Sequence, residues 1–434
     1  MKKFKNKHVV TFLLIGAVTS LTYCTKTDQI LNPNDAVTPP TPVENTDTLY
    51  SVKVSSGPAF VSGLGNAWDG TLDPIWNSAP KIKVTCTVPN LGNNTFTGFI
   101  GNTCDVTMHS LYDANNIYIL AEWDGVQKNV KSSPWYFNPV TKAWAQESGS
   151  ATFDVNGIQT RLPFSQDQFV ILFNIANSCY DFYSQSCYAA CHVKTPSMVV
   201  DASGNVISIP NYGGTMRTKE ATEKLDCWRA RMVQSVYANQ AIDAYIDWGN
   251  GGSNANGINK DPQINSTDGG INNKQIIKVT GQNYKVNVPM WMNVNATYNN
   301  GDGAILASDT TSGIAAKVTA VDTNGVLTLN SGAPIDPTIG TDYLRVGEGL
   351  GSKCIPGTIV SLYTGSCADV SANAFYTGTG WRLMLKRALQ TSDTYKQDIN
   401  FSSLSDQLFG IGIMFNGADN QHAIHTGMIL HFKK

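Results

Sequence analysis

Short runs of apolar or alternating residues recur between turn-forming residues along most of this chain. Five of these runs are rich in aromatic and β-branched side chains, and they lie at residues 81–86, 117–123, 169–173, 381–385 and 408–415. Runs of this length between turn-forming residues are typical of the strands of a sandwich. The pattern therefore predicts an all-β fold, one large β-sandwich with long loop insertions and one or two short helices.

Two segments differ from this strand pattern. Trp228, Met232 and Val236 recur every four residues within 219–245, a spacing that places them on one face of a helix. This segment is the strongest helix prediction in the chain. Residues 249–274 are rich in Gly and Asn and contain almost no apolar side chains, so a long exposed loop is expected there.

The first 48 residues carry export features. Residues 1–24 have a lysine-rich start and an apolar core, as a signal peptide does, and their end resembles a bacterial lipobox with Cys24 as the lipidated residue. An ordinary signal peptide is the alternative, since Tyr23 is larger than the residue usual before the cleavage site. Residues 25–48 are rich in Pro and Thr and predict an extended stalk. We expect an exported protein of the periplasm, the outer membrane or the cell surface, attached to a membrane by acyl chains.

Composition limits the classes of function that residues 49–434 can have. The chain has 434 residues, 42% hydrophobic and 15% charged, which excludes a disordered body and a coiled coil. Its 31 basic and 33 acidic side chains leave a net charge of −2, so no global field attracts nucleic acid. The one long apolar run lies at the N-terminus, which excludes a polytopic membrane protein.

The chain contains nine cysteines, and an exported protein reaches an oxidising compartment. Without Cys24 the number is even, as expected where disulfides persist. Cys86 with Cys104 and Cys354 with Cys367 are candidates for local bridges. The sequence leaves the connectivity open, because eight cysteines allow 105 pairings.

The segment from Cys187 to His192 carries the most informative chemistry. A c-type haem site normally reads C-x-x-C-H, in which two thiols bond the porphyrin and the adjacent imidazole binds iron. Here three residues separate Cys187 from Cys191, while the Cys191–His192 adjacency is kept. The alternatives are a Cys187–Cys191 disulfide, or a bridge from this segment to Cys179 or Cys227. A zinc site has less support, because no second Cys/His pair has suitable spacing.

Met198 follows six residues after His192 and offers a thioether to the sixth position of the haem iron. A loop methionine that only packs is the alternative. Ligation by His and Met raises the reduction potential and leaves no open position for oxygen chemistry. This ligand pair therefore favours electron transfer over catalysis.

Several blocks resemble the ethylbenzene-dehydrogenase-type haem-binding domain, which includes haem subunits of molybdenum dehydrogenases and of dimethyl-sulfoxide-reductase-like enzymes, and free-standing c-type cytochromes. The resemblance covers about residues 60–432, and its blocks occur in the family's order. These blocks are DGTLDPIW at 69–76, LYDANNIYILAEWD at 111–124, DQFVILFNI at 167–175, KLDCWRA at 224–230 and GWRLMLKRAL at 380–389. The departures are the extra residue between the thiols and the Asn/Gly-rich stretch at 249–274.

The resemblance implies an immunoglobulin-like β-sandwich that binds haem. His192 matches the branch of the family in which haem is covalently attached, so a c-type haem is favoured. In non-covalent members a Met and a Lys hold the iron, which makes Met198 a ligand in either branch and Lys386 a speculative alternative with b-type haem. The family further implies a redox protein or a molybdenum oxidoreductase subunit as partner.

Other polar residues receive simpler interpretations. His422 and His425 follow an apolar strand, and one of them as a second axial ligand would lower the potential of the haem. The resemblance implies instead a turn at one end of the sandwich, in which both histidines are expected to be solvated. Four aspartates share no EF-hand spacing and are interpreted as turn residues rather than calcium ligands: Asp69, Asp73, Asp124 and Asp369. No nucleotide-binding or nucleophile-elbow motif occurs.

The favoured function is therefore a monohaem c-type cytochrome that transfers single electrons and is not itself an enzyme. The main alternative is a surface carbohydrate-binding module without haem, because aromatic residues crowd the N-terminal third and could stack on sugars. The preferred interpretation of these residues is that they pack the core or line the haem. They are Trp68, Trp76, Trp123, Trp135, Tyr136 and Trp144. A haem enzyme with an open iron position is a third hypothesis, and the Met, Lys and His candidates speak against it.

Overall fold

The computed structural model of this chain is built mainly from β-strands. It describes residues 47–90, 96–147, 149–179, 182, 199–200, 206–207, 216–218, 220–249, 257–293, 303–345, 353, 355–392 and 396–434. The predicted all-β class, with long loops and two short α-helices among the described residues, is confirmed.

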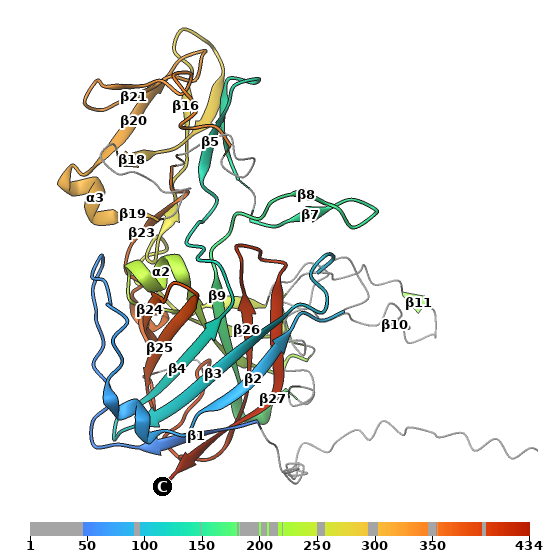
Figure 1. The fold of residues 1–434 in the computed structure, drawn as a ribbon. Coiled ribbons are helices and arrows are strands. Elements are labelled where there is room, and N and C mark those ends of the chain that lie inside the picture. The colour runs from blue at the N-terminus through green and yellow to red at the C-terminus, as the bar shows by residue number, and fades with distance from the viewer. Residues whose placement is uncertain are drawn as a thin grey trace, which may run out of the picture. The chain divides into compact units, whose positions relative to one another are not determined.

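Twelve strands form one large sheet, in which β2, β3 and β4 run side by side (Figure 1). The strand order is β14-β13-β12-β9-β26-β27-β1-β3-β4-β25-β24, and β2 pairs with both β27 and β3. The bounds are β1 Thr48–Lys53, β2 Ile82–Thr87, β3 Thr103–Tyr112, β4 Asn116–Asp124, β9 Gln168–Asn174, β12 Leu225–Arg231, β13 Ile242–Ile246, β14 Ile258–Lys260, β24 Ser371–Tyr376, β25 Gly380–Ala388, β26 Gln407–Met414 and β27 His422–Lys433.

The large sheet folds back on itself, so that strands near its two ends meet. The Ala241 N–H, just before β13, donates to the Val370 carbonyl at 3.0 Å. The Ala372 N–H in β24 donates to the Asn239 carbonyl at 3.0 Å. As a result, β3, β4 and β25 face β9, β12 and β26 across a shared apolar core, which is the arrangement of a sandwich.

Three apolar layers explain why several strands are hydrophobic at nearly every position. In β4, alternate residues such as Ile119 and Trp123 enter the core between the sheets, whereas Tyr118 and Leu120 are buried on the outer face under the 52–76 segment. Strand β9 is buried on both faces in the same way. A strand that is covered on both faces loses the simple apolar–polar alternation.

A second group of strands has its own apolar core, built around buried residues such as Trp135, Phe137 and Leu327. Its strands are β5 Trp135–Asn138, β6 Ala143–Gln146, β16 Gln275–Lys278, β17 Lys285–Val288, β18 Trp291–Asn293, β20 Ala315–Val321, β21 Leu327–Leu329 and β22 Pro334–Ile335. The remaining short strands are β7 Thr152–Phe153, β8 Gln159–Arg161, β10 Val199–Val200, β11 Val206–Ile207, β15 Ile271–Asn272, β19 Ile305–Leu306 and β23 Thr358–Val360.

The helices are short. The α-helices among the described residues are α2 Met232–Tyr237 and α3 Ala307–Ser312, and the 3-10 helices are η1 Pro74–Ser78, η2 Ile175–Asn177 and η6 Gly365–Ala368. Across the part of the chain that the structure describes, no helix has both the length and the apolar content that crossing a bilayer requires.

The predicted helix over 219–245 is wrong for most of its length. Residues 225–231 form the central strand β12 and 242–246 form β13, and only α2 between them is helical. Met232 and Val236 lie in α2, as the spacing predicted, whereas Trp228 lies in β12. Because β12 is buried on both faces, an apolar residue of this strand continued the helical spacing. The loop expected at 249–274 is corrected as well, because it contains β14 and β15.

His422 and His425 were expected to lie in a turn, but the structure does not place them in one. Both belong to β27, where His422 is buried and stands with its ring centroid 5.8 Å from that of Phe96. His425 contacts the Thr85 carbonyl at 2.9 Å and an Asp47 carboxylate oxygen at 2.8 Å. Asp69 and Asp73 are turn and cap residues, as predicted, and accept N–H groups two residues ahead.

The tryptophans of the N-terminal third pack inside the protein, and Tyr136 is half-buried. All five tryptophans predicted as core or haem-lining residues are buried, which leaves them unable to form an exposed sugar-stacking surface: Trp68, Trp76, Trp123, Trp135 and Trp144. Cys86 lies directly opposite Cys104 in the β2–β3 pair, but both are free thiols, so the predicted bridge is not formed. Cys354, the proposed partner of Cys367, lies outside the described residues.

Candidate functional site

The residues predicted to bind haem are Cys187, Cys191, His192 and Met198, and all four lie outside the described residues, as does Cys24. The structure does describe the strands from which their segment departs and to which it returns. It also describes Lys386, the speculative alternative ligand.

The segment that carries the motif begins and ends on neighbouring strands. Strand β9 ends at Asn174, which is the register partner of Leu225 at the start of β12. Next to this pair, the Lys224 N–H donates to the Ser178 hydroxyl at 3.0 Å, and that hydroxyl lies 3.2 Å from the Lys224 carbonyl. The Asn174 amide also bonds both backbone groups of Cys179 at 2.9 Å. These hydrogen bonds fix the root of the segment to the sandwich.

An apolar cluster covers the sheet at this root, and we call it the outer cluster. It lies on the outer face of β9, β12 and β13, opposite the sandwich core, and includes two residues of the departing segment, Cys179 and Phe182. Its members are Val170, Leu172, Cys179, Phe182, Leu225, Cys227, Ile242, Ala244, Ile246, Tyr363, Cys367 and Ile424. This surface excludes water beside the root of the motif segment.

Lys386 lies in β25, where its register partners are Tyr118 and Ser371. Its neighbours Leu385 and Arg387 are fully buried toward the sandwich core, so strand alternation turns Lys386 to the outer face of the other sheet. There its ammonium nitrogen lies 5.1 Å from the ring centroid of Phe60. The structure therefore places Lys386 away from the outer cluster, and its role as an iron ligand stays a prediction.

A buried ionic cluster joins the two sheets inside the sandwich. Alternation along β12 turns Asp226 and Trp228 to the same inner face, and Asp243 of β13 is the register partner of Trp228. Arg387 reaches them from β25 of the opposite sheet. Its Nη1 donates to Asp226 Oδ2 at 2.5 Å and lies 3.9 Å from Asp243 Oδ2. The three charged side chains have no solvent exposure.

Further contacts hold the guanidinium in place. Arg387 donates to the Ile399 carbonyl, and the Ile399 N–H donates to Asp226 Oδ2 at 2.9 Å. The guanidinium carbon lies 4.8 Å from the Trp228 ring centroid and 5.3 Å from that of Phe401. The planar cation is therefore enclosed by aromatic faces and by acceptors in its plane.

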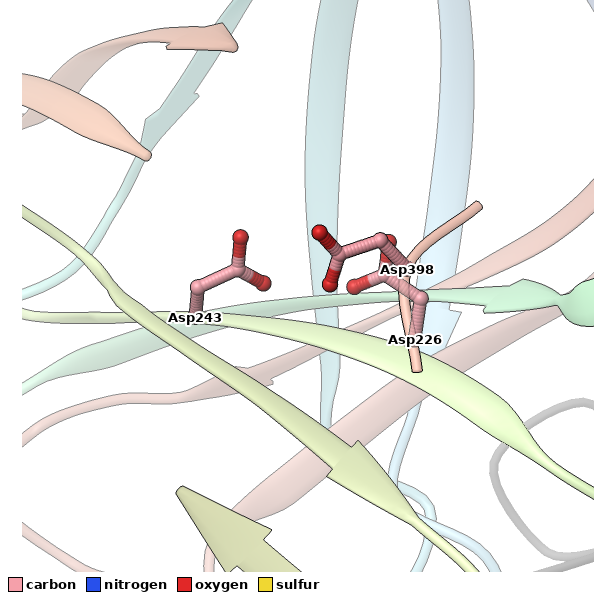
Figure 2. Close-up of side chains that lie close together, drawn as sticks. All are labelled: Asp226, Asp243 and Asp398. Atoms are coloured by element: carbon pink, nitrogen blue, oxygen red, sulfur yellow. The ribbon is translucent and has the colours of Figure 1, made fainter. Parts of the chain in front are cut away.

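Asp398 brings a third carboxylate to this cluster. One carboxylate oxygen from each of Asp226, Asp243 and Asp398 lies within 4.8 Å of the other two, and Figure 2 shows the three carboxylates turned toward a common space. Burial raises the pKa of the Asp243 carboxyl, and the charge of Asp226 raises it further. Burial also raises the pKa of Asp226, although the Arg387 charge acts in the opposite direction.

A separate buried carboxylate, Asp167, ties the start of β9 to β25. It accepts hydrogen bonds from the Trp381 indole N–H at 2.8 Å, the Asn129 N–H at 3.1 Å and the Gly417 N–H at 3.2 Å. Burial raises its pKa to about 7, whereas these hydrogen bonds and the charge of Lys131 act in the opposite direction. This group links loop residues to the core and stands apart from the ionic cluster.

A match to a protein-family model shows to which family the chain belongs. The model of the family described as ethylbenzene dehydrogenase matches residues 73–427, which is most of the folded body. This chain belongs to the ethylbenzene dehydrogenase family. The resemblance inferred from the sequence blocks is therefore confirmed.

Solved structures and curated proteins add little to this family assignment. Two structures of a family 9 carbohydrate-binding module from Caldicellulosiruptor kristjanssonii, in complex with cellotriose or glucose, are similar over 89% of this chain and over 93% and 95% of their own chains. The sequence identities are 9% and 8%, and the TM-score is 0.26 in both cases, which is too low to establish a structural relationship. No curated protein is significantly similar to this chain.

Two of the sequence blocks shared with the ethylbenzene dehydrogenase family contribute to the ionic cluster. The block at 224–230 supplies Asp226 and the block at 380–389 supplies Arg387. This cluster was not predicted from the sequence, because the pattern over 219–245 was interpreted as a helix. The signal was present, since a strand interpretation would have placed Asp226, Trp228 and Ala230 on one buried face.

Proposed function

We propose that this member of the ethylbenzene dehydrogenase family is an exported, lipid-anchored monohaem c-type cytochrome that carries single electrons. The observation that carries the proposal is the Cys187, Cys191 and His192 motif within a chain of this family. Cys187 and Cys191 would form the thioether bonds, His192 would be the proximal ligand and Met198 the distal one. Two thiols, an imidazole and a thioether are a donor set that fits c-type haem. The haem iron supplies reversible one-electron redox chemistry.

The described scaffold supports this role at the root of the motif segment. Hydrogen bonds of Asn174 and Ser178 tie the segment to β9 and β12. The outer cluster beside them is apolar and buried, which lowers the local polarity and so would influence the potential of a nearby redox group.

The partner follows from the family and from the charge balance. An electron carrier of this family would deliver electrons to, or take them from, another redox protein or a molybdenum oxidoreductase subunit. With a net charge of −2 the protein has no strong overall field, so recognition would depend on local contacts around the haem edge. The stalk at 25–48 and a lipid on Cys24 would hold the domain near a membrane, in the periplasm or at the outer membrane surface.

Substitution of the two proposed axial ligands tests this function in the full chain, produced in a host that matures c-type cytochromes. His192→Ala should abolish the low-spin absorption spectrum, with His431→Ala as control, since His431 is exposed and pairs with Asp406. Met198→Ala should keep the haem attached but change its spin state and reduction potential. Met290→Ala provides the matched control.

Each result decides one part of the proposal. A low-spin spectrum that survives in His192→Ala would remove His192 as a ligand. An unchanged spin state and potential in Met198→Ala would remove Met198. Haem that is bound without thioether bonds would replace the c-type assignment with a b-type one, for which Met198 and Lys386 are the candidate ligands.

A further inference from the structure

The interior of the sandwich contains a group of carboxylates from three separate segments. Asp226 lies in β12, Asp243 in β13 and Asp398 in the 396–399 segment that precedes β26. All three residues are buried, and Figure 2 shows their carboxylates directed toward one another. Like charges repel strongly at such distances in a water-free interior, so the arrangement requires compensation.

Hydrogen bonds from the described residues supply only part of this compensation. The Thr391 hydroxyl donates to Asp398 Oδ2 at 2.5 Å. Neither carboxylate oxygen of Asp243 accepts a hydrogen bond, although the residue has 0% exposure. Asp226 uses Oδ2 for Arg387 and the Ile399 N–H, while its Oδ1 is buried and accepts none. Buried carboxylate oxygens that lack donors are costly, and a bound ion is one of the few ways to satisfy them.

The carboxylates of the cluster also outnumber its positive charges, so a cation would improve the charge balance. Arg387 contributes one positive charge against the three carboxylates. Asp261 adds another buried carboxylate close by, where its N–H donates to the Asp243 carbonyl at 3.2 Å. A divalent cation would remove most of this excess negative charge.

The chemistry and spacing of the oxygens identify the kind of cation. Oxygen-only ligands, mainly carboxylates, select hard cations such as Ca²⁺ and Mg²⁺. Ligand oxygens on opposite sides of Ca²⁺ lie roughly 4.6–5.2 Å apart, and on opposite sides of Mg²⁺ about 4.0–4.2 Å apart. One oxygen from each residue lies within 4.8 Å of the other two, a spacing that the ligands of a single Ca²⁺ ion can have.

We propose that Asp226, Asp243 and Asp398 bind a Ca²⁺ ion inside the sandwich. The ion would use the free oxygens of Asp243 and Oδ1 of Asp226, while Arg387 keeps its contact with Oδ2. It links β12 and β13 to the 396–399 segment and, through Arg387, to the opposite sheet. The site is structural, and it does not depend on the proposed haem function.

Calcium titration of the full mature chain after treatment with EDTA tests this site. Thermal unfolding should shift upward with Ca²⁺, because at 100 times the Kd the ratio of folded to unfolded protein rises about 100-fold. The shift should be smaller with Mg²⁺ at equal concentration. Tb³⁺ should bind at the same site and emit when tryptophan is excited, since Trp228 is the register partner of Asp243. Added Ca²⁺ should quench this emission.

Asp243→Asn is the decisive variant. It should lose the Ca²⁺-dependent shift and the Tb³⁺ emission, yet unfold in EDTA no more easily than the wild type, because it removes an uncompensated buried charge. The matched control is Asp105→Asn, an exposed carboxylate that pairs with Lys83 at 2.7 Å, which should keep both responses.

Several outcomes would overturn the proposal. These are a wild-type protein that responds to neither Ca²⁺ nor Tb³⁺, an Asp243→Asn variant that keeps both responses, or an equal response to Mg²⁺. If Asp243→Asn does not fold, the metal content of the wild-type protein decides, and less than one Ca²⁺ per chain after equilibration with excess Ca²⁺ refutes the site. Haem content is measured on the same samples, so a failure of the haem proposal is recognised separately.

Discussion

The Arg387→Met substitution tests how the two sheets are held together. Methionine keeps an unbranched apolar stem but removes the charge and every hydrogen bond of the guanidinium. Arg387 is 1% exposed, bonds Asp226 at 2.5 Å and stacks between Trp228 and Phe401. Its removal leaves the buried carboxylates of Asp226 and Asp243 without their positive partner.

The expected loss of stability is large. Breaking a buried ion pair by removing one partner costs about 3–5 kcal/mol, because the remaining charge stays buried and uncompensated. We therefore expect the free energy of unfolding to fall by about that amount when urea denaturation is followed by tryptophan fluorescence. EDTA is present throughout, so that a bound cation does not mask the effect.

Arg382 provides a control on the same strand. It pairs with Glu122 at 2.7 Å, but the two side chains are 27% and 30% exposed. Exposed pairs contribute about 0–1 kcal/mol, so Arg382→Met should change stability far less than Arg387→Met. An Arg387→Met protein within about 1 kcal/mol of the wild type would refute the importance of the buried pair.

Three further predictions concern other parts of the fold. Asp167→Asn should change the pH dependence of unfolding. Between about pH 4 and 7, native Asp167 retains a proton that the unfolded chain has released. The free energy of unfolding of the wild type should therefore fall relative to that of the variant over this range and then level off. A constant difference in urea midpoints from pH 4 to 8 would contradict this. Ser178→Ala should speed hydrogen exchange at the Lys224 amide, which bonds the Ser178 hydroxyl, whereas unchanged protection would argue against that anchor. Gly380→Ala should destabilise the protein by about 1–3 kcal/mol, since a Cβ there would lie 1.9 Å from the Trp123 carbonyl oxygen. A variant as stable as the wild type would show that the strand can shift to make room for the methyl group.

The strands were the most predictable part of the fold. The runs at 81–86, 117–123, 169–173, 381–385 and 408–415 correspond to β2, β4, β9, β25 and β26, with boundaries that differ by at most a few residues. Each run combines β-branched or aromatic residues with a length of one strand, and turn residues stand at its ends. These local signals do not depend on distant contacts.

The largest error arose where a strand is buried on both faces. In Leu225–Arg231 nearly every position is buried, so Trp228 of this strand continued the helical spacing of Met232 and Val236, which lie in α2. His422 and His425 were misplaced because the resemblance implied a turn there. Strand β27 begins at His422 and extends over twelve residues to Lys433.

The two candidate sites differ in how far sequence can reveal them. The haem motif is readable because its chemistry depends on adjacent residues, Cys191 and His192, in one short segment. The carboxylate cluster is not readable in this way. It combines Asp226 with Arg387, which lies 161 positions away, and their contact depends on how the sheet folds back on itself.

A reduced pyridine haemochrome spectrum, together with a denaturing gel stained for haem, tests whether this protein is a c-type cytochrome. Both are performed on the full chain produced with c-type maturation machinery. We expect a c-type α-band and haem that stays with the polypeptide on the gel. Colourless protein would contradict the cytochrome function, and a b-type band with haem lost on the gel would contradict covalent attachment through Cys187 and Cys191.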